Sequence, residues 1–178
     1  MSDVYDFKDL TIQYSNTSFS LNHPTSESTG AFTFSSSNEL VATISGNIVT
    51  ITGIGSTILQ SFQEAEGNYS SNTQTMNLIV TLIDTELSNF NNIIKTYSDD
   101  TFPLIQPTSN NTNGLFSYTS SDETIAEIYE NVVKIVGIGQ VIIRATQESS
   151  GYYNSAWIEC NLTVNKTDTI LTNFNDVT

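Results

Sequence analysis

The chain repeats itself, and this internal repetition restricts its architecture more than any other feature. The stretch Gly30–Ser37 returns as Gly114–Ser121, and Gly53-Ile54-Gly55 returns as Gly137-Ile138-Gly139, each 84 positions further along without a gap. Before Gly30 the offset is 83 positions, so one residue has been gained or lost in the loop that precedes this glycine. A fixed period of this kind is the signature of a tandem array of one structural module.

A third copy begins near the end of the chain, where Asp168–Asn175 repeats Asp84–Asn91. We therefore expect one module at residues 1–83, a second at 84–167 and the start of a third at 168–178. A module of about 84 residues is large enough to bury a core of its own, whereas the shorter units of solenoids need their neighbours. The repeat thus predicts two independently packed modules followed by a stub.

Hydrophobic and polar residues alternate in short runs throughout each module, which is typical of β-strands. In the first copy Val41–Ile44 and Ile48–Ile51 flank a turn at Ser45-Gly46-Asn47, and this pattern predicts a hairpin. About six to eight such runs in each module predict an all-β chain of two tandem antiparallel β-sandwiches, followed by the first strand of a truncated third repeat. The other runs that we interpret as strands in the first copy are Leu10–Tyr14, Phe19–Leu21, Phe32–Phe34, Thr57–Gln63 and Met76–Leu82.

The charge balance excludes several classes of partner. Asp and Glu outnumber Lys and Arg by 19 to 5, which gives a formal net charge of −14 and an isoelectric point near 4.1. Proteins that bind nucleic acid need basic surface to displace counterions, so nucleic acid is not an expected partner. No run approaches the ~18 apolar residues of a membrane span, so membrane insertion is not expected either.

One segment resembles a known family of β-sandwich repeats. Phe34–Ile58 carries an aromatic residue, two serines, Val41-Ala42, the turn glycine Gly46 and a later glycine and isoleucine at the spacing of the bacterial immunoglobulin-like group 2 repeat. The second copy departs from the pattern at Glu130, which stands where the first copy has Gly46, so we expect this turn to differ in type. The second copy matches the pattern at Tyr118, Ser120, Ser121, Ile125, Ala126, Ile128, Val133, Gly139 and Ile142.

The resemblance implies that the two antiparallel β-sandwiches are Ig-like, and it also implies a range of functions. Such repeats are found in bacterial adhesins and in tail, fibre and capsid-associated proteins of phages and large viruses. The form with Leu-Ser-Asn-Phe at its start (Leu87–Phe90) and Gly-x-Tyr-x-Ser near its end (Gly151–Ser155) is similar to the long tandem arrays of virion or surface proteins. The resemblance covers both full copies.

The residue types needed for catalysis are scarce in this chain. His23 is the only histidine, and the second copy has Gln106 in its place, so a nucleophile–His–acid arrangement is not expected. One cysteine and one histidine do not make a zinc site. Cys160 lies within an alternating run and is interpreted as a small buried hydrophobe. We expect no enzymatic activity and no resident cofactor.

Calcium is the one metal that the sequence leaves open, because hard cations prefer clustered oxygen ligands. Asp84 and Asp168 lie where one module meets the next, and Asp99 and Asp100 lie in a loop near a module end. A junction ion that stiffens the array and solvated loop acids are both compatible with these positions. Glycan attachment is likewise left open at the sequons of Asn16, Asn68, Asn110, Asn161 and Asn165.

Aromatic and apolar residues supply the candidates for contact with partners. Tyr152 and Trp157 replace Asn68 and Thr73 of the first copy, so they are interpreted as contact residues specific to the second copy. Tyr69 and its counterpart Tyr153 are interpreted instead as corner tyrosines whose hydroxyls bond back to the chain. The stub carries Ile170, Leu171 and Phe174, which we expect either to pair with the open edge of a neighbouring chain or to continue into further repeats.

Because the chain repeats one module and has few of the residue types needed for catalysis, the sequence favours a role as a spacer, in the presentation of binding surfaces or in avidity. The sequence therefore predicts a non-enzymatic structural and interaction segment of a virion-surface, tail or fibre protein; the alternative is a bacterial cell-surface adhesin or a secreted binding module. Expected partners are other protein chains, either neighbouring capsid or fibre subunits or a host-surface receptor, with a glycan as a further possibility. Met1–Asp6 shows no secretory signal, which favours the first hypothesis if Met1 is the native start. The expected location is the virion surface or the extracellular space.

Overall fold

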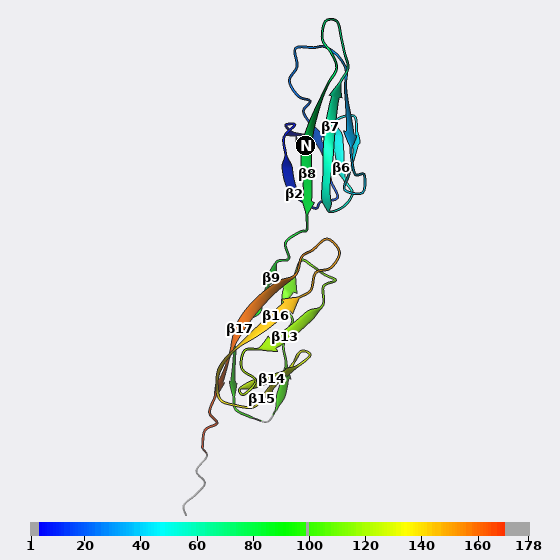
Figure 1. The fold of residues 1–178 in the computed structure, drawn as a ribbon. Coiled ribbons are helices and arrows are strands. Elements are labelled where there is room, and N and C mark those ends of the chain that lie inside the picture. The colour runs from blue at the N-terminus through cyan, green and yellow to red at the C-terminus, as the bar shows by residue number, and fades with distance from the viewer. Residues whose placement is uncertain (1–3, 99, 170–178) are drawn as a thin grey trace, which may run out of the picture. The chain divides into compact units, whose positions relative to one another are not determined.

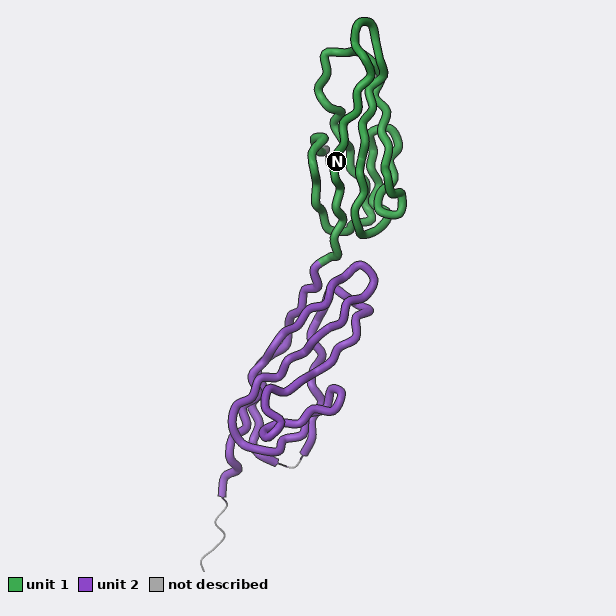
Figure 2. Tube along the Cα trace, viewed as in Figure 1, with its two compact units in different colours: residues 1–83 green, residues 84–178 purple. Residues whose placement is uncertain are grey.

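The protein consists of two compact units, residues 1–83 and residues 84–178, coloured separately in Figure 2. A computed structural model describes residues 4–98 and 100–169. Over these residues the secondary structure is entirely β, and each unit is an Ig-like sandwich of two sheets (Figure 1). The predicted fold class, a tandem of Ig-like β-sandwiches, is confirmed.

The first unit is built from two four-stranded sheets. The smaller sheet has the order β1-β3-β6-β5 and the larger one the order β2-β8-β7-β4. The hairpin predicted around Gly46 is formed by β5 and β6. The strands are β1 (Val4–Tyr5), β2 (Leu10–Gln13), β3 (Ser18–Leu21), β4 (Phe32–Ser36), β5 (Ala42–Ser45), β6 (Ile48–Ile51), β7 (Gly55–Gln63) and β8 (Asn72–Thr81).

The second unit repeats this plan with one difference in the smaller sheet. Its larger sheet has the order β10-β17-β16-β13, and in the described part of the unit its smaller sheet has three strands, in the order β11-β15-β14. A separate two-stranded ribbon joins β9 to β12. The strands are β9 (Leu87–Ser88), β10 (Ile93–Thr96), β11 (Thr101–Pro103), β12 (Thr108–Ser109), β13 (Phe116–Ser120), β14 (Ala126–Tyr129), β15 (Val132–Ile135), β16 (Gly139–Gln147) and β17 (Ala156–Asn165).

One strand pair in each larger sheet is parallel, which the alternation pattern does not reveal. β2 pairs with β8 and β10 pairs with β17 in parallel register, at the edge of an otherwise antiparallel sheet. A side-chain acceptor extends each pair by one rung. The Asp9 carboxylate accepts a hydrogen bond from the Asn77 backbone N–H at 2.7 Å, and the Asn92 amide oxygen accepts one from the Asn161 N–H at 2.9 Å. These bonds hold the register of a short edge strand.

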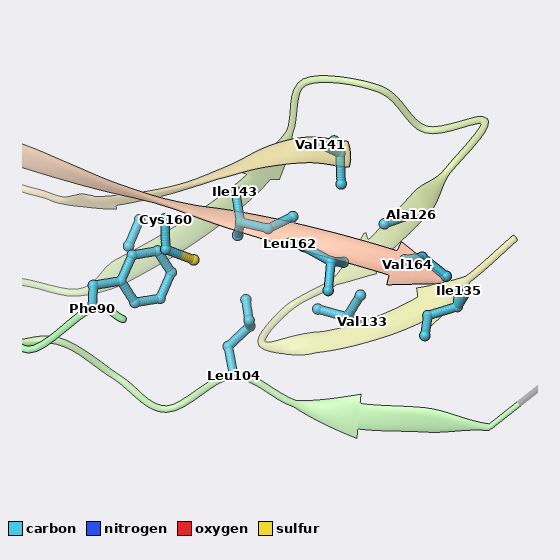
Figure 3. Packing of buried hydrophobic residues seen from close by; sticks show 11 residues of the cluster. Phe90, Leu104, Ala126, Val133, Ile135, Val141, Ile143, Cys160, Leu162 and Val164 are labelled. Atoms are coloured by element: carbon cyan, nitrogen blue, oxygen red, sulfur yellow. The ribbon is translucent and has the colours of Figure 1, made fainter. Parts of the chain in front are cut away.

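Each unit closes a core of its own. In the second unit, alternate residues of β16 and β17 point inward, and Figure 3 shows Ile143, Cys160 and Leu162 facing the same interior as Phe90 and Val133. The first unit has an equivalent cluster. Each fully buried aliphatic side chain of this size contributes about 1.5–3 kcal/mol. The core residues of the first unit are Phe19, Leu21, Val41, Ala42, Val49, Ile51, Leu59, Met76, Leu78 and Val80.

Close packing explains why the Gly-Ile-Gly motif returns. A Cβ on Gly53 would lie 2.4 Å from the Leu40 carbonyl oxygen, and one on Gly137 would lie 2.4 Å from the Thr124 carbonyl oxygen.

The turn at Glu130 has the same backbone conformation as the turn at Gly46, since Glu130 has a φ of 56° and Gly46 a φ of 60°. The expectation that the two turns differ in type is therefore wrong. Glu130 keeps the left-handed conformation at a cost of about 1–2 kcal/mol.

A buried glutamine ties a long loop to the larger sheet in both units. Gln147 is 2% exposed, and its Nε2 donates to the carbonyl oxygens of Asn111 at 2.6 Å and Gly114 at 2.8 Å. Its Oε1 accepts a hydrogen bond from the Ser109 hydroxyl. Gln63 of the first unit bonds in the same way to Ser26, Ser28 and Gly30. The polar atoms of each buried amide are thereby satisfied, as burial requires.

Candidate interaction surface

The outer face of the larger sheet in the second unit carries Trp157, the only tryptophan of the sequence. The register of β16 and β17 places Trp157 opposite Thr146, Glu159 opposite Arg144 and Asn161 opposite Ile142. Because successive side chains on a strand alternate between faces, these residues share the outer face, away from Ile143 and Leu162. Trp157 is 57% exposed there. We call this set of residues the Trp157 face.

Arg144 joins the aromatic and acidic residues of the Trp157 face into one arrangement. Its Nη2 lies 2.7 Å from Glu159 Oε1, and its guanidinium carbon lies 4.4 Å from the centre of the Trp157 ring. A half-exposed ion pair contributes up to about 1 kcal/mol, and an exposed cation–π contact about 0.5–1 kcal/mol. These contacts order the indole before any partner arrives. The arrangement presents a flat apolar ring with polar groups beside it, which suits contact with another protein or a sugar ring.

The first unit presents an aromatic residue at the same rung, although the aligned positions differ. Phe62 on β7 lies opposite Thr73 on β8, whereas in the second unit Thr146 on β16 lies opposite Trp157 on β17. The exposed aromatic residue therefore lies on β7 in the first unit and on β17, the counterpart of β8, in the second unit. Two rungs further along the same face, beyond Gln60–Thr75 and Arg144–Glu159, each unit pairs an exposed isoleucine with an asparagine, namely Ile58 with Asn77 and Ile142 with Asn161. Both units thus share an exposed aromatic-and-isoleucine face, which comparison along the chain does not reveal.

The tyrosines near the tip of the second hairpin lie in a tight turn. Tyr152 is 40% exposed and follows Gly151, whose φ is 58°. The backbones of Ser150 and Tyr153 bond to each other across this turn. In the first unit Tyr69 closes the equivalent turn and is 48% exposed. The corner interpretation of Tyr69 is wrong, because the residue closes a hairpin turn with half of its side chain in solvent.

The calcium candidates that the structure describes, Asp84, Asp100 and Asp168, do not form a metal site with one another. Asp84 accepts a hydrogen bond from the Asn154 amide at 2.8 Å, and its carbonyl oxygen accepts one from the Asn110 amide. Asp100 and Asp168 are exposed, and Asp99 lies outside the described residues. Over residues 4–98 and 100–169 the structure contains no group of three or more His, Cys, Asp or Glu side chains able to hold a metal ion. The remaining interaction candidates, Ile170, Leu171 and Phe174, also lie outside the described residues.

The two residues with potential reactivity are held in structural environments. The His23 ring stacks on Phe32 with ring centres 4.7 Å apart, in an open groove whose counterpart in the second unit carries Gln106. Burial raises the pKa of the Cys160 thiol to about 11, so the thiol stays protonated at neutral pH. Cys160 is buried, as the sequence predicts. In the described part of the chain, no helix is long and apolar enough to cross a membrane.

Comparison with known proteins finds solved structures with a similar fold but assigns the chain to no family. No family model matches the chain, and no curated protein matches it. Domains 4 and 5 of the S-layer protein SbsC are 14% identical, over 75% of this chain and 70% of that chain, with a TM-score of 0.37. Human Protocadherin-24 EC1-2 is 11% identical over 90% and 96%, with a TM-score of 0.37. Drosophila N-cadherin EC1-3 is 11% identical over 90% of this chain and 65% of that chain, with a TM-score of 0.36. At these values the likeness carries no argument about function.

Proposed function

We propose that the chain is a non-enzymatic structural and interaction segment of a virion-surface, tail or fibre protein, exposed outside the cell and built from tandem Ig-like modules. The observation that carries this proposal is the recurrence of one exposed face, with an aromatic residue and an isoleucine, on two modules that each close their own core. Repeated presentation of one face raises avidity for a repeated partner without any new contact.

Several polar side chains, two buried and two exposed, have structural roles that support a non-catalytic function. Gln63 and Gln147 fasten loops, Asp9 extends a strand pair and Asp84 is bonded to Asn154. The acidic surface, with a net charge of −14, keeps such a chain soluble and resists non-specific association. These features together fit a spacer that also carries a binding face.

The partner of the Trp157 face is a protein surface, such as a neighbouring subunit or a host receptor. Exposed aromatic residues beside an arginine are the residues most often found at the centre of protein interfaces. Arg144 and Glu159 neutralise each other in the free protein, so the face adds no net charge to be desolvated. Trp157 is therefore the residue whose loss should weaken binding most.

Immunogold electron microscopy tests the proposed location. An antibody raised against the chain is applied to native particles and to the cells that produce them. Label along the outside of a particle, tail or filament is the expected result. Label confined to a bacterial cell wall favours the adhesin alternative, and label confined to the cell interior contradicts both.

Binding to the isolated native particle or cell tests the face itself. The Trp157→Ala variant is expected to bind at least ~30-fold more weakly, since the loss of a central aromatic anchor costs about 2 kcal/mol or more. Tyr129→Ala is the matched control, because Tyr129 is an exposed aromatic residue on the other sheet. Equal binding by the two variants would show that the Trp157 face is not the contact surface.

A further inference from the structure

The two modules differ in where their opening strand lies. In the first unit β1 pairs in parallel with β3, with Val4 opposite Ser20 and Tyr5 opposite Leu21. In the second unit the aligned residues Leu87–Ser88 form β9, which pairs with β12 instead. Over residues 4–98 and 100–169, the smaller sheet of the second unit therefore lacks the strand that covers its edge in the first unit, and β11 pairs with β15 alone.

Two asparagines explain this diversion. The Asn154 amide oxygen accepts a hydrogen bond from the Thr85 N–H at 2.9 Å, and the Asn110 amide oxygen accepts one from the Glu86 N–H at 3.0 Å. The first copy has Ser70 and Glu27 at the positions of Asn154 and Asn110, so it lacks both amides. The bonds hold the opening segment of the second unit beside β12 and away from β11.

The edge of β11 that corresponds to the edge of β3 covered by β1 borders an apolar groove of about 230 Å³. Phe102 lies at this groove, and its counterpart in the first unit, Phe19, is covered by Tyr5 in an edge-to-face contact with ring centres 5.1 Å apart. The Lys95 ammonium lies 4.6 Å from the centre of the Phe102 ring. The groove is lined by Asn89, Phe90, Asn91, Ile93, Lys95, Phe102, Pro103 and Ile105.

The backbone at this edge keeps the donor that a strand would use. In the first unit the Asn22 N–H donates to the Tyr5 carbonyl oxygen at 2.8 Å. The residue at the same position in the second unit is Ile105, which is 83% exposed. Within the described part of the chain, the Ile105 N–H makes no hydrogen bond to protein. The edge of β11 thus offers the Ile105 N–H to an added strand in the position that β1 occupies in the first unit.

We infer that the β11 edge and its groove take the segment Asp168–Phe174 of a second copy of this chain as an added parallel strand. The segment repeats the sequence of the module openings, and the repeat register places Leu171 opposite Pro103, with the Thr172 carbonyl oxygen accepting the Ile105 N–H. Main-chain bonds to an open sheet edge supply affinity in this mode, and the groove supplies specificity. This inference deepens the proposed function, since it names one partner.

Chain length, position and charge favour this occupant. Residues 170–178 lie outside the described structure and follow directly on its last described residue, Thr169. The equivalent segment 84–90 belongs to the unit that follows β8 and not to the unit that contains β8. Residues 168–178 carry two aspartates and no basic residue, which complements Lys95 in a chain that has only five basic residues.

A labelled peptide of residues 168–178, added to the chain ending at Thr169, tests the inference by fluorescence anisotropy. Saturable binding with one peptide per chain is expected, and a scrambled peptide of the same composition should not bind. Ile105→Pro removes the N–H donor and should weaken binding about tenfold, equivalent to about 1.4 kcal/mol. Lys95→Glu should also weaken binding, whereas Lys166→Glu, an exposed lysine outside the groove, should not.

Sedimentation of the two chain lengths provides the second measurement. The chain of residues 1–178 should self-associate reversibly at physiological salt, and the chain of residues 1–169 should remain a monomer. Absence of peptide binding, or binding that neither Ile105→Pro nor Lys95→Glu weakens, overturns the inference. A monomeric 1–178 chain that blocks the added peptide also overturns it, because its own tail would then fill the groove. None of these results affects the location of the native protein, which the microscopy tests separately.

Discussion

Replacing the buried glutamine of the second unit by glutamate should unfold that unit selectively. Gln147→Glu keeps the size and shape of the side chain but removes the two N–H donors that bond to the Asn111 and Gly114 carbonyl oxygens. A carboxylate oxygen would then face those carbonyl oxygens at the distances of 2.6 and 2.8 Å that the amide now spans. The change therefore tests the hydrogen bonds of the amide without a change in packing.

The structure allows the magnitude to be worked out. Each buried carbonyl left without a donor costs about 1–3 kcal/mol, and a buried unpaired charge adds to this cost. We expect a loss of at least ~3 kcal/mol at neutral pH, a large part of the ~5–15 kcal/mol that stabilises a typical domain. The same environment raises the folded-state pKa of the new carboxyl above its ordinary value of about 4.3. The loss is therefore smallest below about pH 4 and grows as the pH rises through the folded-state pKa.

Urea unfolding followed by tryptophan fluorescence measures this loss, because Trp157 is the only tryptophan and reports on the second unit alone. With a slope of about 1 kcal/mol per molar urea for a module of this size, the midpoint should fall by about 3 M at pH 7. Gln63→Glu should leave the fluorescence midpoint unchanged while lowering the circular dichroism transition of the first unit. The exposed Gln140→Glu is the control. A fluorescence midpoint for Gln147→Glu within about 0.5 M of the unchanged protein would refute the reasoning.

Three further predictions concern single positions. Cys160 of the folded protein should react with iodoacetamide at about pH 8 far more slowly than in the urea-unfolded chain, because burial raises the pKa of its thiol to about 11; equal rates would contradict this. Hydrogen bonds from the Thr124 side chain and backbone N–H lower the pKa of Asp122 below its ordinary 3.8, so its contribution to stability is present above that value and is lost as the pH falls through the folded-state pKa. Asp122→Asn, the counterpart of the natural Asn38, should therefore make fluorescence-detected stability less dependent on acid pH, and an unchanged dependence would contradict the assignment. Gly137→Ala should lower the fluorescence midpoint by about 1–3 M, since its new Cβ meets the Thr124 carbonyl oxygen; a silent substitution would mean that the backbone moves aside freely.

The sequence predicts the sandwich because alternation depends on residues that are close together in the chain. The hairpin at Gly46 and the inward positions Leu59 and Leu78 follow from the period of two residues alone. The parallel pairing of β2 with β8 does not follow from it, because strand direction depends on where the chain crosses between the sheets. Alternation is the same in parallel and antiparallel pairs.

The candidate site was predictable only in part, because its residues are brought together by the pairing of neighbouring strands, which the sequence pattern does not show. Trp157 stands out in the sequence, but its equivalence to Phe62 depends on the cross-strand pairs with Thr146 and Thr73. The Arg144 contacts depend on the same register. A missed signal was available for the buried amides, because Gln63 and Gln147 align at an inward-facing position at the end of the same alternating run in both copies. A polar residue retained there indicates a buried hydrogen-bond anchor.

Hydrogen–deuterium exchange of the Leu162→Ala variant tests most directly whether the two sandwiches are independent. Leu162 and its counterpart Leu78 are both fully buried, each in the core of its own unit, and truncation of such a side chain costs about 2–5 kcal/mol. Loss of protection should be confined to peptides from residues 84–169, and Leu78→Ala should give the mirror result in residues 4–83. If Leu162→Ala also exposes the amides of β7 and β8 to exchange, the two modules share one cooperative core, and the account of autonomous units is wrong.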